Sequence, residues 1–480
     1  MPSRRGGDLV VNIHEKRRTS SRPRTVTRLA PLALLGALLA TPASAQNVHH
    51  QTLAFGDRAL GMGGAFTGLA TDHGAAWYNP AGLAFLETDA ISGSFLLHAF
   101  ENLTFEGDEL RLETTRRPTF PLYATGVVGI GPRDHAGRHR HAVGIVVVRP
   151  LQQRRRLEAQ VDPAAGMPAE ILIDRVHHLT WFGPSWASQL TPRFGFGASL
   201  LATVSTFEHR EVLLGTGADG GGSVRSTLTE VKSNHLVLRM GGLYVGRRTR
   251  FGFMLQLPGL ALREQGIIKD LRALPGRTPF FAKDENVAGA FPIPAELRLG
   301  VSTTFGANDR FVFAADLQLV SETPSRSLVD LPAIADAAPG QAAAAAFVDL
   351  DTAREGVLNA AIGLEWKVRR DLLFRFGVTT DLSAARPLPA SSDRFQEERI
   401  PSIGGSGSIG TLLGDLTELN IGIAAVTGEG EAMVLDPRAG LGTPRYPRVR
   451  ATRRVVTFFI SGRLRRPTEG ETPQLEGGAE

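Results

Sequence analysis

Histidine is the residue type in this chain best suited to binding metal ions or moving protons. His135, His139 and His141 are close enough in sequence to share one ion. They lie in a predicted polar turn beside Arg138 and Arg140, however, and the positive charge of these arginines opposes a bound cation. We therefore expect no metal site in this turn.

The sequence also lacks the common catalytic motifs. His177 and His178 are adjacent in a predicted strand, where neighbouring side chains point to opposite faces, so they cannot form one site. The chain contains no G-x-S-x-G motif, which would present a nucleophilic serine, and no paired-carboxylate motif. We expect a protein that is not an enzyme and needs no cofactor.

A glycine-rich run, Leu60-Gly61-Met62-Gly63-Gly64-Ala65-Phe66, precedes the first predicted strand. A nucleotide-binding loop is one interpretation, but the spacing is not G-x-G-x-x-G and no strand comes before the run. We expect these glycines instead to adopt positive φ and to approach a surrounding wall closely. Room for that approach would come from small residues on the inner face of the wall, namely Gly363, Gly377 and Gly422.

The elements around this run are predicted strands, in which apolar and polar residues alternate. One stretch places Leu358, Ile362 and Trp366 on one face and Asn359 and Glu365 on the other. Similar alternation occurs at 296–305, 311–319, 372–379, 418–423 and 454–464. A soluble β-sandwich alternates in the same way, so alternation alone does not identify the solvent.

The lengths of the connections favour a membrane barrel. Short turns at about 191–193, 247–249, 307–309, 369–371 and 414–415, with a longer one at 132–140, alternate with seven long polar segments. The long segments are roughly 101–119, 151–170, 208–225, 258–292, 321–355, 382–401 and 427–451. Tight turns at one end and extended loops at the other are typical of outer-membrane barrels. We predict an all-β fold, a transmembrane antiparallel β-barrel of about 14 strands, which is wide enough to need a plug in its lumen.

The first 45 residues predict a secretory signal peptide with a basic N-terminal region. They carry eight basic and two acidic residues, then an apolar run, then Ala43-Ser44-Ala45 at the cleavage position. Because the whole chain has a formal net charge of +5, the remainder carries −1, and we expect no nucleic-acid partner. The absence of cysteine among the 480 residues also suits an exported protein.

The segment before the first strand resembles the hatch of the FadL/TodX family of outer-membrane transport proteins. Its run from Leu60 to Phe66 matches the family's Leu-Gly-x-Gly-Gly-Ala-Phe pattern, and Asn79-Pro80-Ala81 matches its Asn-Pro-Ala turn. Asparagine and proline favour a turn for physical reasons as well, because proline fixes φ and asparagine bonds nearby backbone. The chain is also similar to PorV-like relatives, which share the barrel.

The residue patterns and this resemblance together predict a signal peptide (1–45), an N-terminal hatch (46–87), a transmembrane barrel (88–466) and a polar C-terminal tail (467–480), although a polar tail departs from barrels that end on a terminal aromatic residue. By the resemblance, the protein transports hydrophobic compounds. The resemblance implies passive uptake of hydrophobic molecules, either long-chain fatty acids or aromatic hydrocarbons, across the bacterial outer membrane by movement of the hatch. The expected partners are hydrophobic small molecules, outer-membrane lipid and the barrel-assembly machinery. The residues expected to hold or gate the hatch are Gly61, Gly63, Gly64, Asn79, Pro80 and Ala81.

Two other functions stay open on the sequence alone. PorV-like relatives imply a scaffold that holds exported or surface proteins at the outer membrane. A barrel enzyme acting on lipid would need a serine and a histidine close together, which sequence spacing does not show.

The long segment 258–292 mixes apolar residues with charges, which predicts a short amphipathic helix in an outer loop. By the same resemblance, such a loop helps to capture the hydrophobic ligand. The candidate ligand-binding residues are Leu260, Leu262, Ile267, Ile268 and Leu271. The alternative is a loop helix that only packs on its neighbours.

Overall fold

A computed structural model describes most of the chain after residue 53. The described residues are 54–86, 90–107, 111–116, 122–133, 138–161, 169–216, 221–273, 275–276, 278–287, 291–325, 353–369, 371–393, 395–413, 417–436 and 445–465. The predicted signal peptide, the first residues of the predicted hatch, His135 and the polar tail lie outside them.

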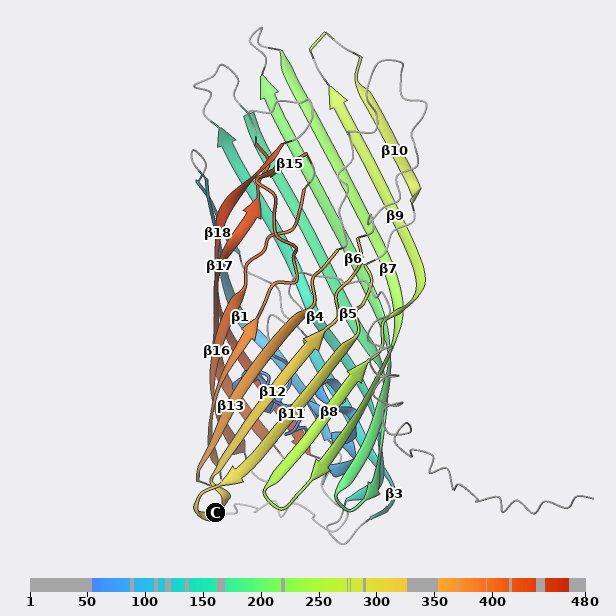
Figure 1. Cartoon of the computed structure of the whole chain (residues 1–480), viewed down its shortest axis with the longest axis vertical. Helices are drawn as coiled ribbons and strands as arrows, with labels where there is room; N and C mark the ends of the chain where they lie inside the picture. The colour runs from blue at the N-terminus through green and yellow to red at the C-terminus, as the bar shows by residue number, and fades with distance from the viewer. Residues whose placement is uncertain are drawn as a thin grey trace, which may run out of the picture. The chain divides into compact units, whose positions relative to one another are not determined.

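The described strands form one closed antiparallel sheet (Figure 1). β1 closes it by pairing with β18, from Ala90 opposite Arg465 to Glu106 opposite Arg450. The strands are β1 (Ala90–Glu106), β2 (Arg111–Arg116), β3 (Leu122–Arg133), β4 (His139–Val161), β5 (Ala169–Thr191), β6 (Phe194–Thr216), β7 (Gly222–Val245), β8 (Thr249–Gln256), β9 (Leu260–Ala273), β10 (Phe280–Val287), β11 (Glu296–Phe305), β12 (Phe311–Val320), β13 (Val357–Arg369), β14 (Leu372–Asp381), β15 (Ser391–Ser392), β16 (Ser402–Leu413), β17 (Thr417–Met433) and β18 (Tyr446–Arg465).

Three positions in the wall are each filled by two strand segments. β2 and β3 both pair with β1, and β8 and β9 both pair with β7. β11 pairs with β8, and β10 pairs with β9. β10 and β11 therefore also share a single position in the wall. Because the two-residue β15 belongs to a loop, the barrel has 14 strands, which confirms the predicted number.

The outer face of the barrel is apolar and its inner face is polar, as the alternation predicted. On β13, Leu358, Ile362 and Trp366 are 51%, 53% and 42% exposed, whereas Asn359 and Glu365 are buried. A barrel in water would bury the apolar face instead, because exposed apolar surface is unfavourable there. The exposed apolar band is therefore the surface of a barrel that lies in lipid.

Aromatic side chains border this band near the short turns. Phe305, Phe311, Trp366 and Phe374 form a row across four adjacent strands, with ring centroids 5.3, 6.2 and 6.0 Å apart. Aromatic rows at this level are typical of the membrane interfaces of β-barrels. The row therefore marks one edge of the apolar band.

The wall is much taller on one side than on the other (Figure 1). β4, β5, β6 and β7 have 23 or 24 residues, whereas β12 and β14 have 10. Since about 9–11 residues cross a membrane, the taller strands continue beyond the apolar band. Their outer faces then carry charged pairs, Arg210 with Glu208 at 3.4 Å and Lys232 with Glu230 at 2.6 Å.

The lengths of the predicted outer loops were therefore partly wrong. Residues up to 161 in β4, from 169 in β5, up to 216 in β6 and from 222 in β7 are strand. The apolar and polar contrast that identifies a strand in sequence is lost where both faces become polar or mixed, so these extensions were read as loop.

The predicted amphipathic helix between 258 and 292 is also wrong. β9 and β10 pair with each other there, from Phe280 opposite Arg272 to Val287 opposite Gly266. β9 additionally pairs with β7 over most of its length. Hydrogen bonds to a long neighbouring strand stabilise an extended conformation, and this tertiary pairing overrides the local spacing of apolar residues.

The short connections are as tight as predicted. β5 ends at Thr191 and β6 begins at Phe194, and β13 ends at Arg369 and β14 begins at Leu372. Between β11 and β12, a 3-10 helix (η2, Ala307–Asp309) contains Asn308 and Asp309 with φ of 56° and 51°. Asparagine and aspartate tolerate this left-handed conformation better than most residues.

Residues 54–86, called here the N-terminal segment, lie inside the barrel toward the end with the short turns (Figure 1). They form α2 (Asp57–Gly61), α3 (Ala75–Tyr78) and the 3-10 helix η1 (Pro80–Phe85). Most of their side chains are buried, and the helices contact strands on opposite sides of the barrel, including β1, β6, β14 and β17. No helix in the described part of the chain has the length and hydropathy needed to cross a membrane.

Candidate functional site

Glycines on both partners let the N-terminal segment lie directly against the wall. Gly63 and Gly64 have φ of 65° and 87°, a conformation that glycine adopts at little cost. A Cβ at Gly377 of β14 would lie 2.1 Å from the Gly63 nitrogen, and one at Gly363 of β13 would lie 2.7 Å from the Met62 carbonyl oxygen. No larger residue fits at either wall position without displacing this backbone.

Two of the predicted glycines act differently. Gly61 lies in the helix α2 and does not need a positive φ. Its only role is to let the segment approach the wall, because a Cβ there would lie 2.1 Å from the Ser408 hydroxyl oxygen. Gly422 does not face the N-terminal segment; it makes room for the ring of Phe459 instead. The sequence pattern identified small lumen-facing residues but not what each one faces.

Asn79 joins three parts of the molecule. Its amide nitrogen donates to the carbonyl oxygens of Thr67 at 3.1 Å and of Gly242 in β7 at 3.0 Å. Its side-chain oxygen accepts from the Ala81 nitrogen at 3.2 Å, and Pro80 occupies the first turn of η1. One buried side chain thus fixes the turn, the preceding loop and the wall together.

Polar groups of the wall bond the backbone of the N-terminal segment. One carboxylate oxygen of Asp316 in β12 accepts from the nitrogens of Phe66 and Thr67 at 2.8 and 2.7 Å. Next to it, the hydroxyl of Ser302 in β11 donates to the Gly68 carbonyl oxygen at 3.0 Å. Bonds from a charged acceptor to buried backbone are among the stronger hydrogen bonds in proteins.

Two strands away from β11, Arg239 of β7 holds α3. Its guanidinium lies 3.7 Å from the centre of the Trp77 ring and donates to the Trp77 carbonyl oxygen at 2.9 Å. It also donates to Gln256 of β8 at 2.8 Å. A buried cation over an aromatic face is favourable when water is excluded, so this contact stabilises the packed position of the segment.

A ladder of ion pairs crosses the inner wall and ends on α2. Arg58 makes two bonds of 2.7 Å to Glu365 of β13, and Arg375 of β14 donates to the same carboxylate at 2.8 Å. Arg375 also bonds Glu418 of β17 at 3.0 Å, and Arg463 of β18 reaches Glu418 at 2.5 Å. Breaking a buried pair leaves an unpaired charge, which costs roughly 3–5 kcal/mol when the pair is fully buried.

Two carboxyl groups are buried within the N-terminal segment itself. Burial raises the pKa of Asp57 well above its usual value, and the negative charge of Asp72 raises it further. Burial likewise raises the pKa of Asp72. Asp57 accepts from the Ser92 hydroxyl of β1 at 2.8 Å, and Asp72 accepts from the Gly74 nitrogen at 2.7 Å. Protonation of these groups therefore favours the packed segment.

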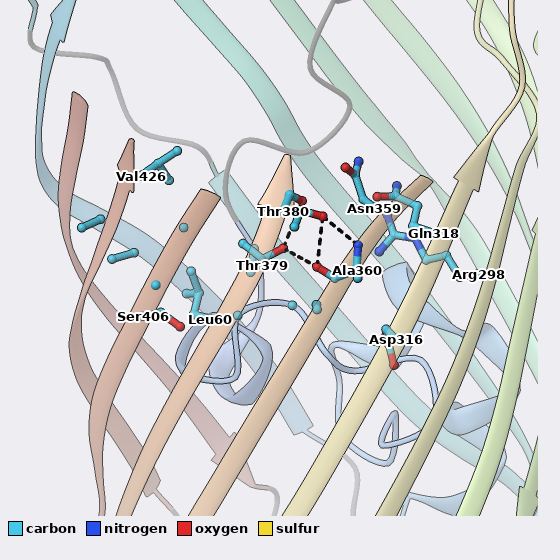
Figure 2. Close-up of a pocket in the computed structure, with 18 residues that line it drawn as sticks. Leu60, Arg298, Asp316, Gln318, Asn359, Ala360, Thr379, Thr380, Ser406 and Val426 are labelled. Carbon is cyan, nitrogen blue, oxygen red and sulfur yellow. Dashed lines mark hydrogen bonds between the residues drawn. The ribbon is translucent and has the colours of Figure 1, made fainter. Parts of the chain in front are cut away.

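Beside Leu60, little space remains between the segment and the wall. A cavity of about 60 Å³ lies between Leu60 of the N-terminal segment and the inner faces of β11 to β17. Asp316, Asn359, Thr380 and Ser406 are among its lining residues (Figure 2). A dry cavity that binds benzene has a volume of about 150 Å³. The packed segment thus leaves this cavity too small for a hydrocarbon ligand.

A larger cavity of about 250 Å³ lies nearer the tall end of the barrel. Its walls are the aromatic rings of Phe207 in β6, Phe291 and Phe395, together with Leu388. The Phe207 and Phe291 ring centres are 4.9 Å apart. A second cavity, of about 60 Å³, shares Phe395; the apolar side chains of Leu103, Ile173 and Met433 line it together with Arg156 and Arg175. We call these two cavities the outer chamber.

The segment 395–398, which separates the two cavities, is held by ion pairs. The Glu397 carboxylate bonds Arg175 of β5 with one oxygen and Arg354 with the other, the latter at 2.5 Å. Glu398 lies 3.7 Å from Arg175, and the Arg175 guanidinium is 5.4 Å from the centre of the Phe395 ring. Although burial opposes it, the positive charge of Arg175 and Arg354 lowers the pKa of Glu397.

The candidate ligand-binding residues predicted from sequence do not come together. Leu260 and Leu262 are 63% and 60% exposed, whereas Ile268 is buried with its neighbours in the barrel. Ile267 precedes the inward-facing Ile268, and Leu271 follows the inward-facing Asp270, so both lie on the outer face of β9. A pattern that would share one face of a helix is divided between the two faces of a strand.

Sequence reasoning missed the outer chamber. Phe207 is buried at an inward position of β6, and Phe291 and Phe395 come from segments between strands. The signal available in the sequence was Phe207, an aromatic residue at an inward position of a strand. Its partners Phe291 and Phe395 are 84 and 188 residues away from it. Among the described residues, no three His, Cys, Asp or Glu side chains are grouped so as to hold a metal ion.

No protein-family model matches the chain, and no curated protein matches it in sequence. Solved structures do match it. A FadL homologue from Pseudomonas aeruginosa is 16% identical, with a TM-score of 0.59 over 88% of this chain and 100% of that one. The Pseudomonas putida toluene transporter TodX is 15% identical (TM-score 0.57, 86% and 99% covered), and the Ralstonia pickettii toluene transporter TbuX is 16% identical (0.52, 86% and 98%). Since these matches span nearly the whole of each chain, this protein has the FadL/TodX-family fold.

Proposed function

We propose that this protein is a transporter of the bacterial outer membrane that takes up hydrophobic molecules passively, by rearrangement of its N-terminal segment. The observation that carries the proposal is the order of features along the lumen. An apolar, aromatic chamber lies toward the tall end of the barrel, and a packed polypeptide segment lies toward the other.

The outer chamber supplies the first step. Rings and aliphatic side chains bind a hydrophobic molecule by removing its surface from water, at roughly 25 cal/mol per Å² of apolar area. Such a site draws the molecule out of water without chemical change. This supports transport or binding rather than catalysis.

The N-terminal segment supplies the second step. Hydrogen bonds and ion pairs hold it against the wall, and its described residues 54–86 belong to no strand, so it can move while the barrel stays intact. Gly61, Gly63, Gly64, Asn79, Pro80 and Ala81 then act as the residues that seat it. Movement of the segment opens a path past the inner end of the chamber.

The substrates proposed are aromatic hydrocarbons or long-chain fatty acids. Two structures of the same fold are described as toluene transporters, and a third as a monoaromatic hydrocarbon channel. The proposed location further requires export through the signal peptide in residues 1–45 and insertion by the barrel-assembly machinery, with lipid around the apolar band.

Uptake by cells tests the proposal. Labelled toluene and labelled palmitate are presented to an outer-membrane-bearing host with and without the protein, and the host's own transporters of this type are deleted. Faster entry of at least one compound is expected. If each compound enters cells with the protein no faster than cells without it, and a protein partner co-purifies in stoichiometric amount, the scaffold function of PorV-like barrels would be favoured instead.

A further inference from the structure

Of the guanidinium groups of Arg175, Arg354 and Arg386, which lie around the 250 Å³ cavity, two are engaged by carboxylates. Arg175 and Arg354 share Glu397, and Arg175 also faces Glu398. The third, Arg386, lines the 250 Å³ cavity from the loop after β14 and is exposed. Among the residues that the structure describes, no carboxylate lies within ion-pair distance of Arg386.

The charges around this cavity therefore do not cancel. Two arginines face two glutamates, which leaves the positive charge of Arg386 uncompensated at the cavity wall. Glu397 does not repel an incoming anion strongly, because its two oxygens are both bonded to guanidinium groups. A guanidinium binds a carboxylate through a planar pair of N–H donors, so Arg386 suits an organic acid.

Size restricts the apolar part of the ligand. A cavity of about 150 Å³ lined by Leu, Ile and Phe binds benzene, so about 250 Å³ holds one substituted ring. The rings of Phe207, Phe291 and Phe395 supply edges and faces for such a ring to pack against. A long acyl chain does not fit within this volume as a whole.

We propose that the outer chamber binds small aromatic carboxylates, with the ring among Phe207, Phe291 and Phe395 and the carboxylate on Arg386. This rests on the proposed function and goes beyond it, since a small aromatic acid is neither a neutral hydrocarbon nor a long-chain fatty acid. Arg386 is then the residue that distinguishes an acid from a neutral hydrocarbon of the same shape.

Equilibrium dialysis of the purified, detergent-solubilised protein tests the assignment with two labelled probes, 4-methylbenzoate and its neutral analogue p-xylene. The unchanged protein is expected to bind the acid more tightly than p-xylene. Arg386→Gln should weaken binding of the acid by about tenfold, as expected for loss of a charged hydrogen bond, and leave p-xylene unchanged. Arg386→Lys should restore most of the preference, because it keeps the charge.

The matched control is Arg210→Gln, which removes an exposed arginine from the outer face of β6, away from the chamber. It should change neither affinity. An acid-to-hydrocarbon affinity ratio that is the same in Arg386→Gln as in the unchanged protein would overturn the assignment. Binding of p-xylene with no preference for the acid would overturn it while leaving the proposed transport function standing, and binding of neither probe would count against both.

Discussion

The lumen is occupied in two different ways at its two levels. Around the N-terminal segment, contacts are made by backbone, glycine and paired charges, and the cavity beside Leu60 measures about 60 Å³. In the outer chamber, contacts are made by phenylalanine rings around a cavity of about 250 Å³. One level is built to be filled by the chain itself, and the other leaves room for a molecule that the chain does not supply.

These two kinds of contact explain how one barrel can be closed and still bind a ligand. Hydrogen bonds to Asn79 and Asp316 have strict geometry, so they define one position of the N-terminal segment. Contacts with Phe207 and Phe395 are non-directional, so they accept ligands of varied shape. Changes at the first level should therefore act on closure, and changes at the second should act on affinity.

The largest effect is expected from adding one methyl group to the wall behind the segment. In Gly377→Ala, the new Cβ would lie 2.1 Å from the Gly63 nitrogen, and overpacking of this kind costs about 1–3 kcal/mol or more. The segment should leave its position, and ionic current through a planar bilayer should rise from near zero to that of an open barrel.

The matched control for this change is Gly405→Ala on the neighbouring β16. Its added Cβ meets nothing closer than 3.8 Å, so the barrel should stay closed. A Gly377→Ala protein that folds normally, as judged by its heat-modifiable mobility on gels, and still carries no current would show that close packing at Gly63 is not what holds the segment.

A smaller effect is expected from pH. Because burial raises the pKa of Asp57 in the folded protein, its contribution to holding the segment is complete below the ordinary aspartate pKa, about 3.9, and is lost as pH rises through the raised value. Channel openings should become more frequent as pH increases over this range. In Asp57→Asn, the rise of opening frequency with pH that is due to this carboxyl should be lost. That rise amounts to at most about tenfold for each unit by which the pKa of Asp57 is raised in the packed state.

The sign of the pH effect makes this prediction easy to contradict. The difference between the unchanged protein and Asp57→Asn isolates the contribution of this carboxyl from those of other groups. The quantity to follow is the opening frequency of the unchanged protein relative to that of Asp57→Asn. If this ratio falls as pH rises, or does not change with pH, Asp57 does not bind a proton in the packed state.

The smallest effect is expected in the outer chamber. Phe395→Ala removes a ring shared by both cavities and should weaken p-xylene binding about fivefold, the loss expected for part of a buried side chain. Closure should be unaffected. Leu262→Ser, on the exposed outer surface, is the control and should change affinity less than about twofold. Equal losses in both variants would place the ligand outside the barrel.

The fold was largely predictable from sequence because a membrane barrel has a simple repeating rule. Lipid outside and polar contacts inside impose strict alternation, and β13 with its exposed Ile362 and buried Glu365 follows it. Where the strands rise into water the rule no longer holds, so the upper parts of β4 to β7 were read as loops. The strand β9 was missed because its pairing with β7 decides its conformation, not its own pattern of apolar residues.

The seat of the N-terminal segment was predicted only in part. Glycine and the Asn-Pro-Ala turn have conformational meanings that can be read locally, and Gly63 and Asn79 contact the barrel wall. Their partners could not be read in the same way. Asp316 is 250 residues from Phe66, and such distant pairings depend on the register of every intervening strand.

The most direct test of the account is to fasten the N-terminal segment to the wall. The chain has no cysteine, so Asp57→Cys with Ser92→Cys introduces the only two thiols, at positions whose side-chain oxygens are 2.8 Å apart. With the disulfide formed, uptake of labelled toluene and palmitate should fall to the level of cells without the protein, and reduction should restore it; each single-cysteine variant should transport throughout. Undiminished uptake by a fully cross-linked protein would contradict the claim that this segment must move.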